Sequence, residues 1–186
     1  MTQPKLQGSD PPRQRRAYFE CRHGQLHVHN AIPVGGGFDE LTTLICLHGT
    51  GSTGRIFLEL SGRLGRSRSV YSPDLPGTGE SDGPETAMTP AAGAEAIGDF
   101  LDSMRFRQVD LLGVGTGAAV AVELAIARPK VVRKVVMLGM VAPEGWRPAT
   151  RLPQLAQATL DIPEALPQQV QLAEGRMVSR LLEFLA

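Results

Sequence analysis

The 186-residue sequence is poor in cysteine, in aromatic side chains and in net charge. Its 19 basic and 19 acidic residues cancel, so no overall field favours nucleic acid or an anionic membrane as a partner. It contains no apolar run near the roughly 20 residues of a membrane span and no apolar core of a secretory signal. We therefore expect a cytoplasmic protein with reduced cysteines, Cys21 and Cys46, and with neither a nucleic-acid nor a membrane partner.

Histidine is also scarce and unevenly placed, because none of the four histidines follows His48. His27 and His29 are two residues apart in an expected strand, so their side chains point to one face of it. A metal site needs further ligands, and the sequence suggests no third one near this pair. We therefore expect no metal, and we interpret this face of the strand as solvent-exposed.

Strand-like and helix-like segments alternate along most of the chain. Residues 1–16 are rich in proline, glutamine and arginine, which predicts a disordered N-terminal lead, whereas residues 17–186 are expected to form a single domain. An antiparallel hairpin is predicted at 17–22 and 25–32, followed by strands at 41–47, 69–73, 109–112 and 132–140 and helices at 56–64, 90–106 and 118–126. This order predicts an α/β fold with a mostly parallel, doubly wound sheet preceded by an antiparallel hairpin.

Three glycines at alternate positions separate the strand at 109–112 from the helix that follows it. In Gly113-Val114-Gly115-Thr116-Gly117 they let the backbone reverse sharply. The turn resembles the nucleophile elbow of the α/β-hydrolase superfamily, whose G-x-S-x-G motif presents a serine at a strained strand-to-helix corner. Gly115 occupies the position of that serine, so the nucleophile for covalent acyl transfer is lost.

Two further loops carry the same resemblance, in particular to the AB hydrolase-1 group. The strand that ends in His48-Gly49-Thr50-Gly51 resembles the family's HG oxyanion loop. The segment from Asp74 to Asp82 resembles its D-x-P-G-x-G-x-S-D turn, which is the most specific of these motifs. The resemblance covers roughly residues 17–143 and implies an α/β-hydrolase fold.

The resemblance also implies roles for individual residues and a class of ligand. The backbone N–H groups of Thr50 and Thr116 would point at an oxyanion, and His48, Gly49 and Gly51 would line the binding site. It implies a small carbonyl or ester compound as the substrate or ligand, and no cofactor.

Residues 145–186 have two interpretations. They are either a shortened C-terminal half or the opening of a helical lid. In a shortened half, Asp161 would stand near the position of the family's acid, with Glu144 as a second candidate. Arg176 would replace the family's histidine, and arginine cannot act as a general base near neutral pH.

The same two interpretations differ in how the sheet ends. In a shortened half, a strand at 170–173 would pair beside the strand at 135–139, and a helix at 177–186 would pack on the sheet. A lid would instead leave the sheet edge unpaired. Because the chain is short for the superfamily, an open edge could drive self-association into a homo-oligomer.

Three functions stay open. The first is a hydrolase of small carbonyl or ester compounds whose hydrolysis is impaired or altered, and the second is a non-catalytic protein that binds a small molecule or a partner on the hydrolase scaffold. The third is an NAD(P)-binding oxidoreductase, because residues 49–54 fit G-x-G-x-x-G and Asp74 ends the next strand. That third function would leave His48 and the D-x-P-G turn unexplained.

Overall fold

The computed structural model describes residues 10–36, 41–141, 143–147 and 156–160. Within them the chain forms one seven-stranded sheet in the order β1-β2-β4-β3-β5-β6-β7. The strands are β1 (Arg13–Cys21), β2 (Gly24–Ile32), β3 (Thr43–Leu47), β4 (Val70–Pro73), β5 (Val109–Val114), β6 (Val132–Leu138) and β7 (Ala156–Leu160). The helices are the 3-10 helix η1 (Gly54–Phe57), α1 (Leu58–Leu64), α2 (Pro90–Ser103) and α3 (Thr116–Ala127).

The pairing of the strands confirms the predicted fold class. The β1–β2 hairpin is antiparallel and joins the rest of the sheet through an antiparallel β2–β4 pair. From β4 to β7 all neighbours are parallel, and β3 pairs with β5 so that Ile45 lies opposite Leu111. The carboxyl ends of β3 and β5 therefore meet at one edge of the sheet, which is where open α/β sheets bind ligands.

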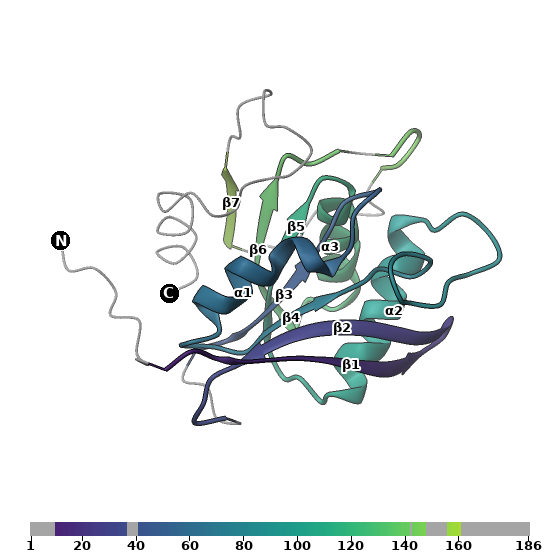
Figure 1. The fold of residues 1–186 in the computed structure, drawn as a ribbon. Coiled ribbons are helices and arrows are strands. Elements are labelled where there is room, and N and C mark those ends of the chain that lie inside the picture. The colour runs from purple at the N-terminus through teal and green to yellow at the C-terminus, as the bar shows by residue number, and fades with distance from the viewer. Residues whose placement is uncertain (1–9, 37–40, 142, 148–155, 161–186) are drawn as a thin grey trace.

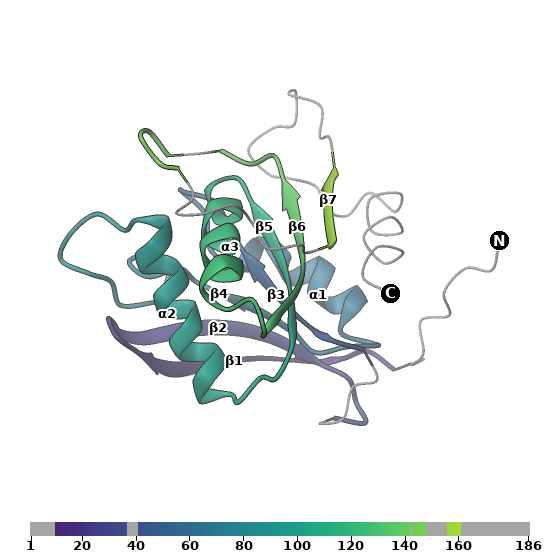
Figure 2. The same cartoon turned by 180° about the vertical axis from the view of Figure 1, so that it is seen from behind.

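Helices cover both faces of the sheet. Figure 1 shows α1 in front of the strands, and Figure 2 shows α2 and α3 packed on the opposite face. Successive residues of β3 serve the two layers in turn: Leu44 and Cys46 join the apolar cluster under α1, whereas Ile45 and Leu47 join the cluster under α2 and α3. The unbroken apolar run of β3 is thus explained by burial on both sides.

Several predicted strand boundaries were wrong, and two of the differences have a clear cause. β1 begins at Arg13 instead of Ala17, because the register with β2 continues to the pair of Arg13 and Ile32. Its charged side chains are tolerated because β1 is an edge strand and those residues stay exposed. β6 ends at Leu138 instead of Met140, since Gly139 turns the chain with a positive φ of 52°.

The strand next to β6 is also not the predicted one. β7 (Ala156–Leu160) pairs with β6 in parallel, in the place predicted for a strand at 170–173. Residues 170–173 and the predicted helix at 177–186 lie outside the described residues. In the part of the chain that the structure describes, no helix has the length and apolar character needed to cross a membrane.

Candidate functional site

The turn between β5 and α3 has the sharp strand-to-helix geometry expected of the elbow. Gly115 precedes the helix with φ 57° and ψ −122°, a conformation that residues with a side chain adopt only under strain. Its N–H donates a hydrogen bond to the Leu138 carbonyl (3.0 Å), and its carbonyl accepts one from the Val141 N–H (3.1 Å). The end of β6 therefore holds the apex of the turn in place.

The three elbow glycines differ in what a side chain would meet. A Cβ at Gly113 would overlap the Ala118 backbone, and one at Gly117 would overlap the Leu47 carbonyl, so both positions require glycine for close approach. A Cβ at Gly115 would meet only the Gly49 Cα, at 3.7 Å. The turn thus has room for a side chain at its apex and carries none.

Thr50 and Thr116 lie together beside this apex. The Thr50 N–H donates to the Thr116 hydroxyl oxygen at 2.7 Å, and the two hydroxyl oxygens are 2.9 Å apart. Thr116 is also the first residue of α3, where helix N–H groups have no acceptor within the helix. The two residues predicted to present oxyanion-binding amides therefore lie together. The Thr50 N–H is already engaged, because it donates to the Thr116 hydroxyl.

His48 is a structural residue in this site. Its ring is 1% exposed and lies between the oxyanion loop and the turn after β4. Nδ1 donates to the Gly49 carbonyl (2.9 Å) and Nε2 accepts from the Leu75 N–H (2.9 Å), an arrangement that requires the neutral ring. Burial lowers the pKa of His48 and so favours this state. With both nitrogens engaged, His48 positions the loop and has no free nitrogen to act as a base.

These groups border a cavity of about 350 Å³, which we call the crevice. The lining includes the predicted binding residues His48, Gly49 and Gly51 together with Thr50 and Thr116, and their role in binding stays a prediction. The opposite wall is mostly apolar and comes from the turn after β4 and the segment before α2: Leu75, Pro76, Gly77, Thr78, Pro84, Thr86, Ala87 and Met88. An apolar pocket with a few convergent polar groups is typical of a small-molecule site.

Asp74 lies behind the crevice and is 2% exposed. One carboxylate oxygen accepts from the Gly54 N–H (2.7 Å), and the other accepts from the Glu80 N–H (3.0 Å) and from His27 Nδ1 (2.9 Å). Burial alone would raise the pKa of Asp74, but these hydrogen bonds lower it below its ordinary value. A carboxylate so engaged does not receive a ribose hydroxyl, which removes the acid of the predicted dinucleotide site.

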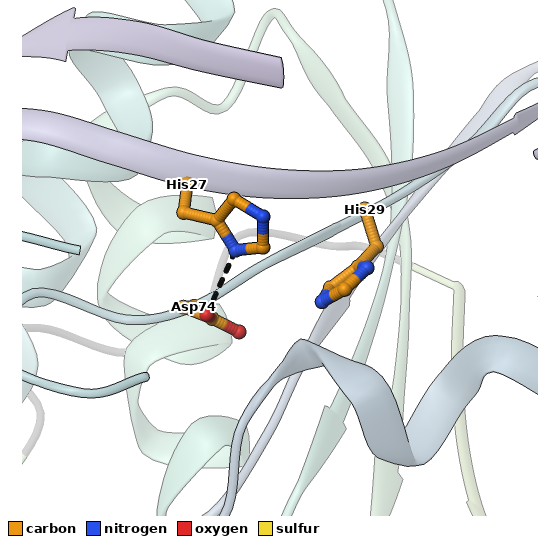
Figure 3. Close-up of side chains that lie close together, drawn as sticks. All are labelled: His27, His29 and Asp74. Atoms are coloured by element: carbon orange, nitrogen blue, oxygen red, sulfur yellow. Dashed lines mark hydrogen bonds and ion pairs between the residues drawn. The ribbon is translucent and has the colours of Figure 1, made fainter. Parts of the chain in front are cut away.

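The structure corrects the interpretation of His27 and His29. Both side chains do point to one face of β2, but they are 1% and 6% exposed, so this face is buried and not solvated. Figure 3 shows that His27 lies against Asp74, with His29 beside it. Potential ligand atoms of the three residues lie within 4.8 Å of one another, so the expectation that no third ligand is near the pair was wrong. The antiparallel β2–β4 pair brings Asp74, which follows β4, next to His27 on β2, and this pairing was not predicted from the sequence.

Of the two predicted acids, only Glu144 is described, and it does not line the crevice. Asp161 and Arg176 lie outside the described residues, and Glu144 is exposed after β6. In the described ranges, the crevice lining includes no carboxylate, and its one histidine is His48.

A mostly parallel sheet with a strand-turn-helix elbow beside an HG loop defines a protein of the α/β-hydrolase fold. Comparison with family models agrees, because residues 44–185 match the alpha/beta hydrolase family. The chain belongs to this family.

Individual relatives match over part of their length. An uncharacterized protein of Mycobacterium tuberculosis (strain ATCC 25618 / H37Rv) is 30% identical over 146 residues, which are 75% of this chain and 42% of that protein. The 2-hydroxymuconate semialdehyde hydrolase of Pseudomonas sp. (strain CF600) is 33% identical over 118 residues, 59% of this chain and 39% of that enzyme. The chain thus spans about two fifths of the length of the curated relatives it matches.

Solved structures support the same fold. The epoxide hydrolase CorEH superposes with a TM-score of 0.64 over 76% of this chain and 47% of that chain, at 20% identity. At this identity the likeness concerns the fold alone.

Proposed function

We propose that the described residues form a small-molecule binding site of hydrolase type that works without a covalent intermediate. The proposal is carried by the apex of the elbow, where Gly115 provides no nucleophile. The Thr116 hydroxyl oxygen instead accepts a hydrogen bond from the Thr50 N–H. Thr116 itself belongs to α3, one position beyond the apex. Among the described residues, no basic side chain forms a hydrogen bond with its hydroxyl. On this proposal the chain is a pseudoenzyme in the acyl-transfer sense.

The ligand we propose is a short carboxylate or another small carbonyl compound. The Thr116 hydroxyl accepts from an amide, and a hydroxyl polarised in this way is a better donor to a further acceptor. The free N–H groups at the start of α3 add a positive electrostatic potential at the same point. A carbonyl or carboxylate oxygen would therefore bind at Thr116 while its carbon chain contacts the apolar wall near Met88.

Fluorophosphonate labelling tests the absence of covalent chemistry. We expect no stoichiometric labelling of the folded protein, because its crevice presents no activated nucleophile. Labelling that reaches one equivalent and disappears on heat denaturation would contradict the proposal and place the nucleophile elsewhere in the chain.

Equilibrium binding tests the ligand class. A panel of acetate, butyrate, ethyl acetate and NAD is titrated into the protein while amide NMR shifts of Thr50 and Thr116 are followed. We expect butyrate to shift both amides and NAD to leave them unchanged. Submillimolar NAD binding at these amides would instead favour the dinucleotide alternative.

Substitutions of Thr116 separate its hydroxyl from its shape. Thr116→Val should weaken butyrate binding about fivefold, since one hydrogen bond contributes about 1 kcal/mol. Thr116→Ser is the matched control and should bind like the parent. Thr50→Val should also have little effect, because the contact to Thr116 made by the Thr50 backbone N–H survives. Equal affinities for the valine and serine variants at Thr116 would remove its hydroxyl from the site.

A location in the cytosol and self-association through a sheet edge stay predictions. Size-exclusion chromatography with light scattering checks the second of these.

A further inference from the structure

A second cavity, of about 390 Å³, lies on the side of the sheet that α1 covers. We call it the α1-side cavity; its lining residues are Gln14, Arg15, Arg16, His29, Arg55 and Leu58. None of these residues lines the crevice. Figure 1 shows α1 in front of the sheet to which β1 and β2 belong, and η1 directly precedes α1 in the chain. The hydrolase-type site does not use this cavity.

Three arginines line the α1-side cavity, and two of them, Arg16 and Arg55, act electrostatically on His29. Arg16 on β1 stands directly opposite His29 on β2, so their side chains share one face of the hairpin. Arg55 reaches the same place from η1, and both arginines are exposed. Within the described residues, neither Arg16 nor Arg55 forms an ion pair, although other arginines such as Arg63 do. Among the described residues, the charges of Arg16 and Arg55 at this cavity are therefore not engaged in an ion pair.

His29 gives the cavity a buried polar wall. Its side chain is 6% exposed, and its Nε2 atom is buried with no hydrogen-bond partner in the structure. Burial, followed by the neighbouring His27, lowers the pKa of His29; the Asp74 carboxylate opposes this shift, and the charges of Arg55 and Arg16 add to the lowering. Both guanidinium charges thus act on the imidazole. An unpartnered buried nitrogen is costly unless a ligand satisfies it.

The same surroundings favour an anion over a metal ion. Figure 3 shows His27, His29 and Asp74 close enough to suggest a cation site, but the Asp74 oxygens already accept three hydrogen bonds. A cation near His29 would also be repelled by Arg16 and Arg55. An anion would be attracted by both arginines and would accept a hydrogen bond from a protonated His29 Nε2, while the Asp74 carboxylate near His29 would oppose it.

We propose that the α1-side cavity binds a phosphate group, either free or as a small monoester, between Arg16, Arg55 and His29. The planar guanidinium fork matches the oxygens of phosphate and donates charge-assisted hydrogen bonds to them. His29 supplies the third donor at the buried wall. The proposal does not depend on catalysis in the crevice.

Titration of inorganic phosphate into the full chain tests the charge requirement. Amide NMR shifts should move saturably at Arg16, His29 and Arg55, with a dissociation constant on the order of 1 mM. Arg16→Ala and Arg55→Ala should each weaken binding roughly tenfold, the usual loss for one charged hydrogen bond. Arg13→Ala is the matched control, since Arg13 lies on the same exposed strand but outside the cavity. Equal effects of all three variants would overturn the proposal, because they would indicate non-specific attraction.

Methyl phosphate identifies the source of the phosphate. A monoester ligand predicts that methyl phosphate binds at least as tightly as phosphate, whereas a site for free phosphate predicts weaker methyl phosphate binding. Absence of saturable shifts with either probe up to 50-fold above the expected constant, on the order of 50 mM, would overturn the proposal.

Sulfate tests the part played by His29, because sulfate keeps its charge between pH 5.5 and 8. The charged groups that face this ring are His27, Asp74, Arg16 and Arg55. Sulfate affinity should rise as the pH falls, since a bound anion favours the protonated ring. His29→Leu should abolish that rise, whereas His29→Gln, which keeps an N–H donor, should retain part of the affinity at pH 8. A pH-independent affinity, or tight Zn²⁺ binding that His29→Leu abolishes, would contradict the anion assignment.

Discussion

The crevice and the α1-side cavity differ in whether their polar groups have hydrogen-bond partners. In the crevice, both nitrogens of His48 have partners, and the Thr50 amide is satisfied by Thr116. In the α1-side cavity, His29 Nε2 is buried and unpartnered beside Arg16 and Arg55.

This difference separates groups that stabilise the fold from groups that await a ligand. A satisfied buried polar group contributes modestly to stability, but its loss leaves its partner unpaired at a larger cost. An unsatisfied one lowers stability, and its removal costs little. The loss in the free energy of unfolding on matched substitutions of His48 and His29 therefore shows which histidine stabilises the fold. Substitution of Asp74 gives the largest loss expected.

Asp74→Ala should have the largest effect on stability. It removes the acceptor of two buried donors, His27 Nδ1 and the Gly54 N–H, and of the partly buried Glu80 N–H. We expect a loss of about 3 to 5 kcal/mol in the free energy of unfolding, measured by urea denaturation. Asp102→Ala is the control, because Asp102 makes an exposed ion pair with Arg128 and should cost less than about 1 kcal/mol. Similar midpoints for the two variants would show that Asp74 has no structural role.

His48→Leu should cost about 2 kcal/mol in the free energy of unfolding, since it leaves the Leu75 N–H unpaired behind the crevice. Urea denaturation at pH 7.5 measures the loss. The NMR shift of the Thr50 amide should change as well, because the Gly49 carbonyl loses its donor. An unchanged denaturation midpoint would mean that water replaces the ring.

Gly115→Ser should cost about 1 kcal/mol, because serine must adopt the φ of 57° without meeting a steric clash. Thermal denaturation measures this loss, and Gly117→Ala, which overlaps the Leu47 carbonyl, should lose more. The serine alone should not give turnover of p-nitrophenyl acetate, since the described crevice offers no free base. Rapid turnover by the variant would reveal a base in residues that the structure does not describe.

His29→Leu should change the free energy of unfolding at pH 7.5 by less than about 0.5 kcal/mol, in contrast to His48→Leu, because it removes a group without a partner. Below pH 6.5 the two proteins should diverge. The pKa of His29 is lowered by burial, so the unfolded chain binds the proton more readily and the parent loses stability as the pH falls. Urea midpoints at pH 7.5 and 5.5 should therefore differ less in the variant. An equal pH dependence would show that His29 is not the group responsible.

Much of the fold follows from local patterns. The apolar run at 41–47 predicts a strand buried on both sides, and the run at 109–112 predicts a second strand. The glycines of the elbow predict the turn between β5 and α3. The motif at His48-Gly49-Thr50 correctly predicts the loop that meets that turn. These features are predictable because each depends on residues that are neighbours in sequence.

The site was harder to predict where it depends on distant contacts. The sequence suggested that the Thr50 and Thr116 amides converge, but not that the Thr116 hydroxyl would occupy the Thr50 amide. It also suggested a solvated face for His27 and His29, because alternation gives the face of a strand but not what covers it. The Asp74 contact comes from strand order, which no local pattern encodes.

The sequence by itself determined the α/β order, the elbow and the absence of an oxygen, sulfur or carboxylate at Gly115, since these are properties of residue identity and spacing. Tertiary structure alone decided which polar groups are satisfied. Burial of His48 between two loops fixes its neutral ring, and burial of His29 between Arg16 and Arg55 leaves its nitrogen without a partner. The physical reason is that hydrogen bonding and desolvation depend on the three-dimensional surroundings of an atom, which residues far apart in the chain supply.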